Sequence, residues 1–373
     1  MKHLIKSLTA LVLISVLITP ALAYNINYDE QNGWYTDQVN ISFDNSSFNN
    51  SSWKTAFLTS ANTWAAQSSN LNFYTTTAQN ISGVNVYYGP VSANSVATEK
   101  TFIFNATVNP HYFGYIGRSN VVFNSSCNFT TNQSQANSTC SPSLRLYDVQ
   151  TIATHELGHS VGLSHSNIAT AVMRGTPLPT IFRTLQSDDK NGVKFIYNSW
   201  QPPSGSKSVT DYKKGDGLDI NVAGSPIGYN EKELIEYSDL IIKGKVIGQT
   251  SPKWNTKDGS EPETEELLGP YSIIYYDVVV EVDKTYKGEL PKDVDNRIYI
   301  RNIGGTIGNI TVTSDENKFE KGQEVFLHLK KNSDTITSNY GPQGYYVIGG
   351  DYNLDTNVIN LGNDVISKME TAT

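Results

Sequence analysis

Three histidines and one glutamate form the part of the chain whose residue types and spacing can do chemistry. His155 and His159 lie four residues apart in a stretch whose apolar residues recur at helical spacing, so both imidazoles project from one helix face and can reach one zinc ion. Glu156 can act as general base toward a water activated by that metal. Gly162 can end the helix with a positive φ and bring His165 round as a third nitrogen ligand. The fourth tetrahedral position is then left for water or substrate.

The pattern H-E-x-x-H-x-x-G-x-x-H from His155 to His165 resembles the zinc signature of the metzincin metallopeptidases. Ser166 directly after the third histidine resembles the matrixin branch of that family. Residues 185–197 are similar to the start of the last catalytic-domain helix of matrixins. This resemblance implies that Met173 forms the methionine turn beneath the zinc, although a lone methionine is more often core filler. It also implies that one of two acids supports the floor of the site, with plain surface acids as the alternative: Asp188 or Asp189.

The elements that must position this site follow upstream in the order that the resemblance requires. Residues 39–43, 83–88 and 120–123 have the pattern of strands, and the last of them is our candidate for the edge strand against which a substrate lies. Residues 53–67 space as an amphipathic helix. The resemblance covers about residues 24–200 and implies an α+β metzincin-like catalytic domain, with a twisted sheet and an active-site helix.

The chain departs from the matrixin pattern in several places. No cysteine switch is visible, so latency, if present, must come from elsewhere. A second, structural zinc is not expected, because His111 and His328 lie in different halves and His111 is typical of a surface loop. Structural Ca²⁺ stays open, since acids are sparse before Asp148. The segment 174–179 differs from the family's usual sequence after Met173, so pocket depth and side-chain preference cannot be transferred.

The amino terminus has the order of a secretory signal peptide over residues 1–23, with an apolar run too short to span a bilayer. We therefore expect a secreted, extracellular chain, with an uncleaved anchor at the cell surface as the alternative. In that compartment Cys127 and Cys140 are expected to pair. Eleven N-x-[ST] triplets are candidate glycan acceptors, although an Asn-rich sequence also produces them by chance: Asn40, Asn45, Asn49, Asn50, Asn80, Asn105, Asn124, Asn128, Asn132, Asn137 and Asn309.

The second half of the chain differs in charge. Residues 24–200 carry 8 Lys and Arg against 9 Asp and Glu, whereas residues 201–373 carry 18 against 27. Neither half is basic enough for nucleic acid. Residues 201–228 read as an irregular linker, and 229–373 as a smaller all-β barrel or sandwich domain. Parts of it resemble the OB-type barrel of netrin-like and metalloproteinase-inhibitor domains. The acidic stretch 258–266 is a solvated loop in one interpretation and a calcium site in the other.

These features predict a secreted zinc-dependent endopeptidase that acts on proteins or peptides, without a membrane span in the mature chain and with an unknown partner for the second domain. His155, His159 and His165 are the predicted zinc ligands, and Glu156 is the predicted catalytic base. The alternative is a cell-surface or secreted binding protein that has a metzincin fold and little catalytic activity. Retention of Glu156 argues against that alternative, since a purely structural zinc site needs no general base.

Overall fold

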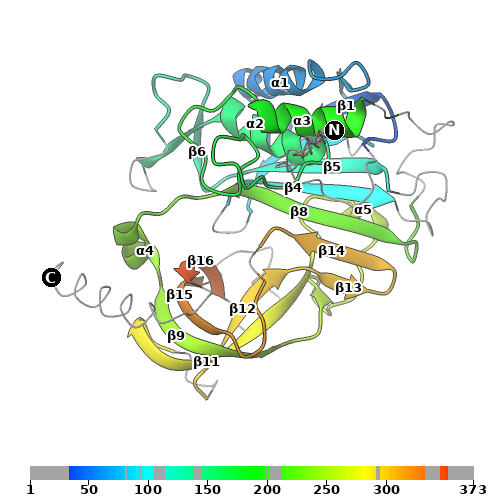
Figure 1. Cartoon of the computed structure of the whole chain (residues 1–373). Coiled ribbons are helices and arrows are strands. Elements are labelled where there is room, and N and C mark those ends of the chain that lie inside the picture. The colour runs from blue at the N-terminus through cyan, green and yellow to red at the C-terminus, as the bar shows by residue number, and fades with distance from the viewer. Residues whose placement is uncertain are drawn as a thin grey trace, which may run out of the picture.

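The computed structural model describes residues 33–351 apart from 80–81, 92–94, 105–113, 138–143, 199, 201–211, 291–294, 317 and 332–344. The predicted signal peptide, His111 and Cys140 lie outside the described residues. Two sheets dominate the architecture, one above the other in Figure 1.

The first sheet has eight strands in the order β13-β14-β8-β4-β5-β3-β1-β2. The strands β2, β1, β3 and β5 are parallel neighbours, and β1, β3 and β5 bury most of their side chains, as expected for strands covered on both faces, whereas the edge strand β2 does not. Four of these strands come from the N-terminal half: β1 (Gln38–Phe43), β2 (Asn72–Thr76), β3 (Val84–Gly89) and β5 (Ile116–Asn124). A fifth strand from this half, β4 (Ser95–Phe104), pairs antiparallel with β5.

This order corrects one expectation. Residues 120–123 were expected to form the edge strand, but they belong to β5, which is paired with β3 on one side and with β4 on the other. All nine residues of β5 are buried, so it forms the middle of the sheet. The sequence could not separate a middle strand from an edge strand, because short apolar runs suit both positions.

Three helices cover one face of this sheet, as Figure 1 shows: α1 (Ser51–Ala65), α2 (Val149–Ser160) and α3 (Ser187–Tyr197). The Asn50 side chain begins α1 by accepting from the backbone N–H groups of Ser52 and Trp53, and the buried face of α1 follows the predicted amphipathic spacing. The Asp148 carboxylate caps α2 in the same way, at the end of the short pair β6 (Asn128–Thr130) and β7 (Leu146–Asp148). None of the helices in the described ranges is long and apolar enough to cross a membrane.

The C-terminal half contributes three strands to the first sheet: β8 (Leu218–Pro226), β13 (Gly305–Ile307) and β14 (Ile310–Ser314). The expectation of an irregular linker up to residue 228 is therefore wrong for Leu218–Pro226, which pairs antiparallel with β4 along nine residue pairs. Both strands also contribute to an apolar cluster, in which Phe102 packs with Leu218 and Ile220. The two halves of the chain thus share one sheet.

The second sheet contains β10 (Lys253–Trp254), β11 (Ile274–Lys287), β12 (Arg297–Ile303), β16 (Tyr345–Asp351), β15 (Glu324–Lys331) and β9 (Leu240–Gln249), in that order. A further pairing of β11 with β9 closes it around its own apolar core. The helices α4 (Glu231–Tyr237) and α5 (Thr264–Leu267) precede β9 and β11. Because strands of this half also extend the first sheet, the structure does not confirm a separate all-β domain.

The features expected of an exported protein are only partly visible. Cys127 is half-buried and has no disulfide partner among the described residues, and because Cys140 lies outside them, the disulfide stays a prediction. Asn124 is 3% exposed and its side-chain amide donates to the Ser95 carbonyl, so the folded chain hides this glycan acceptor. Exposed acceptors include Asn45 and Asn309.

Candidate metal centre

The three predicted ligands come together at the end of α2. His155 and His159 lie one helical turn apart, and their Nε2 atoms are 3.1 Å from each other. Gly162 adopts φ +100°, a backbone conformation that favours glycine, and it turns the chain after the helix. His165 then returns to the site, and its Nε2 lies 3.1 Å from the Nε2 of His155. In the described part of the chain, these residues are the one group of His, Cys, Asp or Glu positioned to hold a metal ion.

The outer nitrogens of two histidines are fixed by backbone carbonyls. His155 Nδ1 lies 2.8 Å from the Val172 carbonyl, and His159 Nδ1 lies 2.8 Å from the Leu163 carbonyl. Donation from Nδ1 leaves the lone pair of Nε2 free to bind a metal. Burial lowers the pKa of His155 to about 3 and lowers that of His159 well below its ordinary value, so both are neutral, as ligands must be. This donor set fits the zinc that the fold implies, whereas the described residues give calcium no support.

His165 has a different outer partner. Its Nδ1 lies 3.2 Å from the Asp315 carboxylate, in the segment that follows β14. The histidine side chain is 19% exposed and that of Asp315 is 30% exposed. Burial lowers the pKa of His165, while the nearby Asp315 charge acts in the opposite direction. A carboxylate on the outer nitrogen of a ligating histidine orients its ring and raises its basicity.

Glu156 is completely buried beside the first histidine. Its Oε1 accepts hydrogen bonds from the backbone N–H of Ser225, at 3.1 Å, and from the Ser225 hydroxyl, at 2.6 Å. Its Oε2 has no hydrogen-bond partner among the described residues. Burial raises the pKa of this carboxyl well above its ordinary value. A raised pKa suits a group that must take up a proton and release it near neutral pH.

The floor of the site is built as the resemblance implies. The Asp189 carboxylate accepts from the backbone N–H groups of Met173 (3.0 Å), Val172 (2.9 Å) and Gln186 (2.8 Å). Of the two candidate acids it is Asp189 that supports the floor, and the same Val172 residue holds His155 through its carbonyl. Asp189 is 1% exposed, and burial raises its pKa although these three bonds act to lower it.

Met173 packs directly against the active-site helix. A Cβ added at Gly158 would lie 2.0 Å from the Met173 sulfur, so this helix position must be glycine for the methionine to sit where it does. The location supports the predicted methionine turn, because Met173 is 2% exposed and belongs to the core cluster that contains Leu157.

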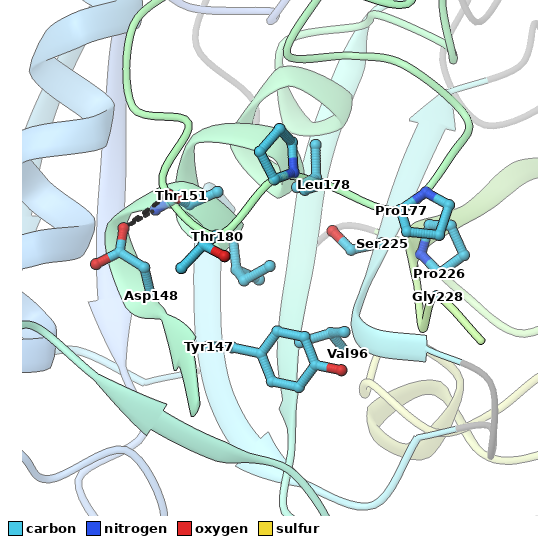
Figure 2. Close-up of a pocket in the computed structure, with 12 residues that line it drawn as sticks. Val96, Tyr147, Asp148, Thr151, Pro177, Leu178, Thr180, Ser225, Pro226 and Gly228 are labelled. Atoms are coloured by element: carbon cyan, nitrogen blue, oxygen red, sulfur yellow. Dashed lines mark hydrogen bonds between the residues drawn. The ribbon is translucent and has the colours of Figure 1, made fainter. Parts of the chain in front are cut away.

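A pocket whose lining residues Figure 2 shows includes Ser225, the residue that hydrogen-bonds Glu156. The lining comes from the end of β7, the first turn of α2, the 177–180 segment, the start of β4, and the end of β8 with the residues just after it. Its residues are Val96, Tyr147, Asp148, Thr151, Ile152, Pro177, Leu178, Pro179, Thr180, Ser225, Pro226 and Gly228. The C-terminal half thus contributes three residues to the lining. The two halves of the chain are in close contact here, since a Cβ added at Gly228 would lie 2.8 Å from the Pro177 side chain.

Sequence reasoning missed every site residue of the C-terminal half. Ser225 and Asp315 lie in ordinary strand and turn sequences with no ligand-like spacing to His155–His165. It also missed Glu99, a fully buried carboxyl on β4 that accepts from the Ser119 and Thr101 hydroxyls. A charged residue in an otherwise buried strand was the one available signal for Glu99. His328 contacts Ser238 and Phe326 in the second half, far along the chain from the other histidines.

A family model agrees with this geometry for the N-terminal half, and several curated proteins are similar to parts of the chain. Residues 31–198 match the family model described as Matrixin. Stromelysin-3 of Xenopus laevis is 42% identical over 62 residues, which is 16% of this chain and 12% of that protein. Interstitial collagenase of Equus caballus is 41% identical over 69 residues, 17% of this chain and 14% of that protein. Chaperone protein HtpG of Rickettsia rickettsii (strain Sheila Smith) is 25% identical over 125 residues, 34% of this chain and 19% of that protein.

The chain therefore spans less than a fifth of the length of each of these curated relatives. Residues 31–198 are matrixin-like, which confirms the predicted resemblance to the metzincin peptidases for this segment. At the family level the match supports a zinc metalloendopeptidase with an α+β catalytic domain.

Proposed function

We propose that this chain is a secreted zinc-dependent endopeptidase. The observation that carries the proposal is the convergence of three imidazoles next to the buried carboxyl of Glu156; burial keeps His155 and His159 neutral, with Nδ1 of each on a backbone carbonyl. A purely structural zinc site takes four protein ligands, whereas this cluster offers three and keeps a general base beside them. Secretion rests on the signal-like order of residues 1–23.

In this proposal His155, His159 and His165 hold the ion through Nε2. Zinc, when bound, supplies a Lewis acid that polarises the scissile carbonyl and lowers the pKa of a water. Glu156 takes one proton from the attacking water as its oxygen bonds to the carbonyl carbon, and later delivers that proton to the leaving amine nitrogen as the C–N bond breaks. Asp189 and Met173 keep the ligand-bearing segments in place, through the backbone bonds described above.

Two variants test these roles. Glu156→Ala should keep zinc and lose turnover, because it removes the base but no ligand. His159→Ala should lose both zinc and turnover. Metal content per chain and cleavage of unfolded casein, with and without a chelator, measure the two properties. Unchanged turnover in Glu156→Ala would refute the assignment.

A second candidate is a binding protein with a metzincin fold and little catalytic activity. It is favoured by one observation: Ser225 hydrogen-bonds the predicted general base and covers it. One zinc per chain together with chelator-sensitive casein cleavage supports the peptidase. Zinc without cleavage, in the wild-type chain and in every variant that uncovers Glu156, supports the binding protein.

A further inference from the structure

The strand β8 occupies the free edge of the matrixin-like part of the sheet. Residues 31–198 supply β4, β5, β3, β1 and β2, so β4 is the outer strand of that segment. Its outer N–H and C=O groups face β8, which runs antiparallel from Phe104↔Leu218 to Ser95↔Pro226. An uncovered edge of this kind is where an extended peptide adds to a sheet by backbone hydrogen bonds. Here the chain's own C-terminal half fills that position.

The end of β8 also reaches the groups that would do the chemistry. Ser225 donates twice to Glu156 Oε1, as described above. The preceding residue, Gly224, donates its N–H to Asp315 at 3.2 Å, and the same carboxylate lies beside His165. The following residue, Pro226, lines the pocket together with Ser225 (Figure 2). The strand β8 therefore runs along β4, past the candidate general base Glu156, and ends at the pocket.

Buried polar contacts fasten the C-terminal half to the peptidase half around this strand. Lys100 on β4 donates to the backbone carbonyls of Leu267, Gly269 and Ser272. On β5, the Asn120 amide donates to the Leu268 carbonyl at 2.9 Å. The four carbonyls lie at the end of α5 and in the residues just after it, so the C-terminal half is hydrogen-bonded to β4 and β5 as well as paired through β8.

Next to the start of α2, Arg145 forms an ion pair with Glu233 of α4, with 2.8 Å between Nη2 and Oε2. Both side chains are less than a tenth exposed, and Glu233 also accepts from the Asn230 backbone N–H. Loss of one partner from a buried ion pair of this kind is strongly destabilising. This ion pair joins the two halves of the chain a few residues after Gly228, beyond the C-terminal end of β8.

We propose that β8 is an intramolecular cover of the metal centre, which occupies the position of an extended peptide on β4 and keeps the enzyme latent until it leaves. This inference rests on the proposed peptidase function. It supplies the latency for which the sequence offers no cysteine switch. Activity then depends on the fraction of molecules in which β8 has left β4, and a peptide substrate must wait for that open state.

Gly224 gives the sharpest test, because a Cβ at this position would lie 2.6 Å from the Ala97 carbonyl oxygen on β4. Gly224→Val in the full chain should push β8 away, and Gly224→Ala is a milder form in case the valine variant does not fold. The matched control is Gly248→Val on β9, where an added Cβ meets nothing within 4 Å. Thermal melting followed by circular dichroism verifies that each variant is folded.

Two readouts are measured on zinc-loaded protein. The first is cleavage of a fluorogenic peptide per bound zinc, which should rise about tenfold or more in the Gly224 variants and stay unchanged in Gly248→Val. The second is fluorescence anisotropy of a labelled synthetic peptide that copies Leu218–Pro226. This peptide should bind the Gly224 variants, because their β4 edge is open, and should bind the wild type at least about tenfold more weakly.

The outcomes distinguish the proposed cover from the proposed peptidase function. Equal peptide binding and equal cleavage in the wild type, the folded Gly224 variants and the control would overturn the cover. Labelled peptide that binds the Gly224 variants selectively, without any cleavage of the fluorogenic peptide, supports the cover while the peptidase function fails. Selective binding together with faster cleavage supports both.

Discussion

Replacing Asp189 by asparagine tests how the floor of the metal centre is held. The carboxylate accepts three backbone N–H groups, two on Oδ2 and one on Oδ1. An amide has one acceptor oxygen, so its better orientation keeps the bonds from Val172 and Gln186 and points an NH₂ group at the N–H of Met173. Loss of one charge-assisted bond costs ~1.5–3 kcal/mol, before the repulsion between the facing N–H groups is counted.

The consequence should extend to the metal. Val172 also positions His155 through its carbonyl, so a displaced floor disturbs a ligand's outer partner, and such changes cost about 10–100-fold in metal affinity or activity. Urea unfolding of the zinc-loaded chain gives the stability, and competition with a chromophoric chelator gives the zinc affinity. The control is Asp188→Asn, which removes the same charge one residue earlier in the first turn of α3, where Oδ2 has no hydrogen-bond partner among the described residues. Equal changes in both variants would refute support through these backbone bonds.

Three further predictions follow from other buried contacts. Gly158→Ala should lower the free energy of unfolding by ~1–3 kcal/mol and reduce peptidase activity, because the added Cβ overlaps the Met173 sulfur. Thermal melting and a cleavage assay measure these two effects, and an unchanged melting temperature would contradict the prediction. Glu99 has a pKa raised by burial from 4.5 to about 8, so the folded chain keeps a proton that the unfolded chain loses. The free energy of unfolding should therefore fall as pH rises from about 4.5 to about 8, and it should stay level at higher pH. Across the same pH range the melting temperature of Glu99→Gln should fall less than that of the wild type. Glu233→Gln should lower the free energy of unfolding in urea by ~3 kcal/mol, because it breaks the buried ion pair with Arg145. A loss of stability no larger than that of an exposed ion pair would contradict this prediction.

Much of the metal centre could be predicted because its spacing is local. The i, i+4 relation of His155 and His159, the turn at Gly162 and the return of His165 all follow from helix and turn geometry within eleven residues. The interior position of residues 120–123 could not be predicted, since an apolar run does not record which strands lie beside it.

The sequence by itself predicted the candidate ligands, the candidate general base and the helix that carries His155, Glu156 and His159, because side-chain type and helical period indicate these together. Only the tertiary structure decided that β8 joins β4, that Ser225 reaches Glu156 and that Asp315 lies beside His165. Strand pairing uses backbone N–H and C=O groups, which every residue except proline offers alike, so no side-chain pattern marks the partner of an edge strand. The fold brings Ser225 and Asp315 into contact with residues that lie about 70 and 150 positions earlier in the chain.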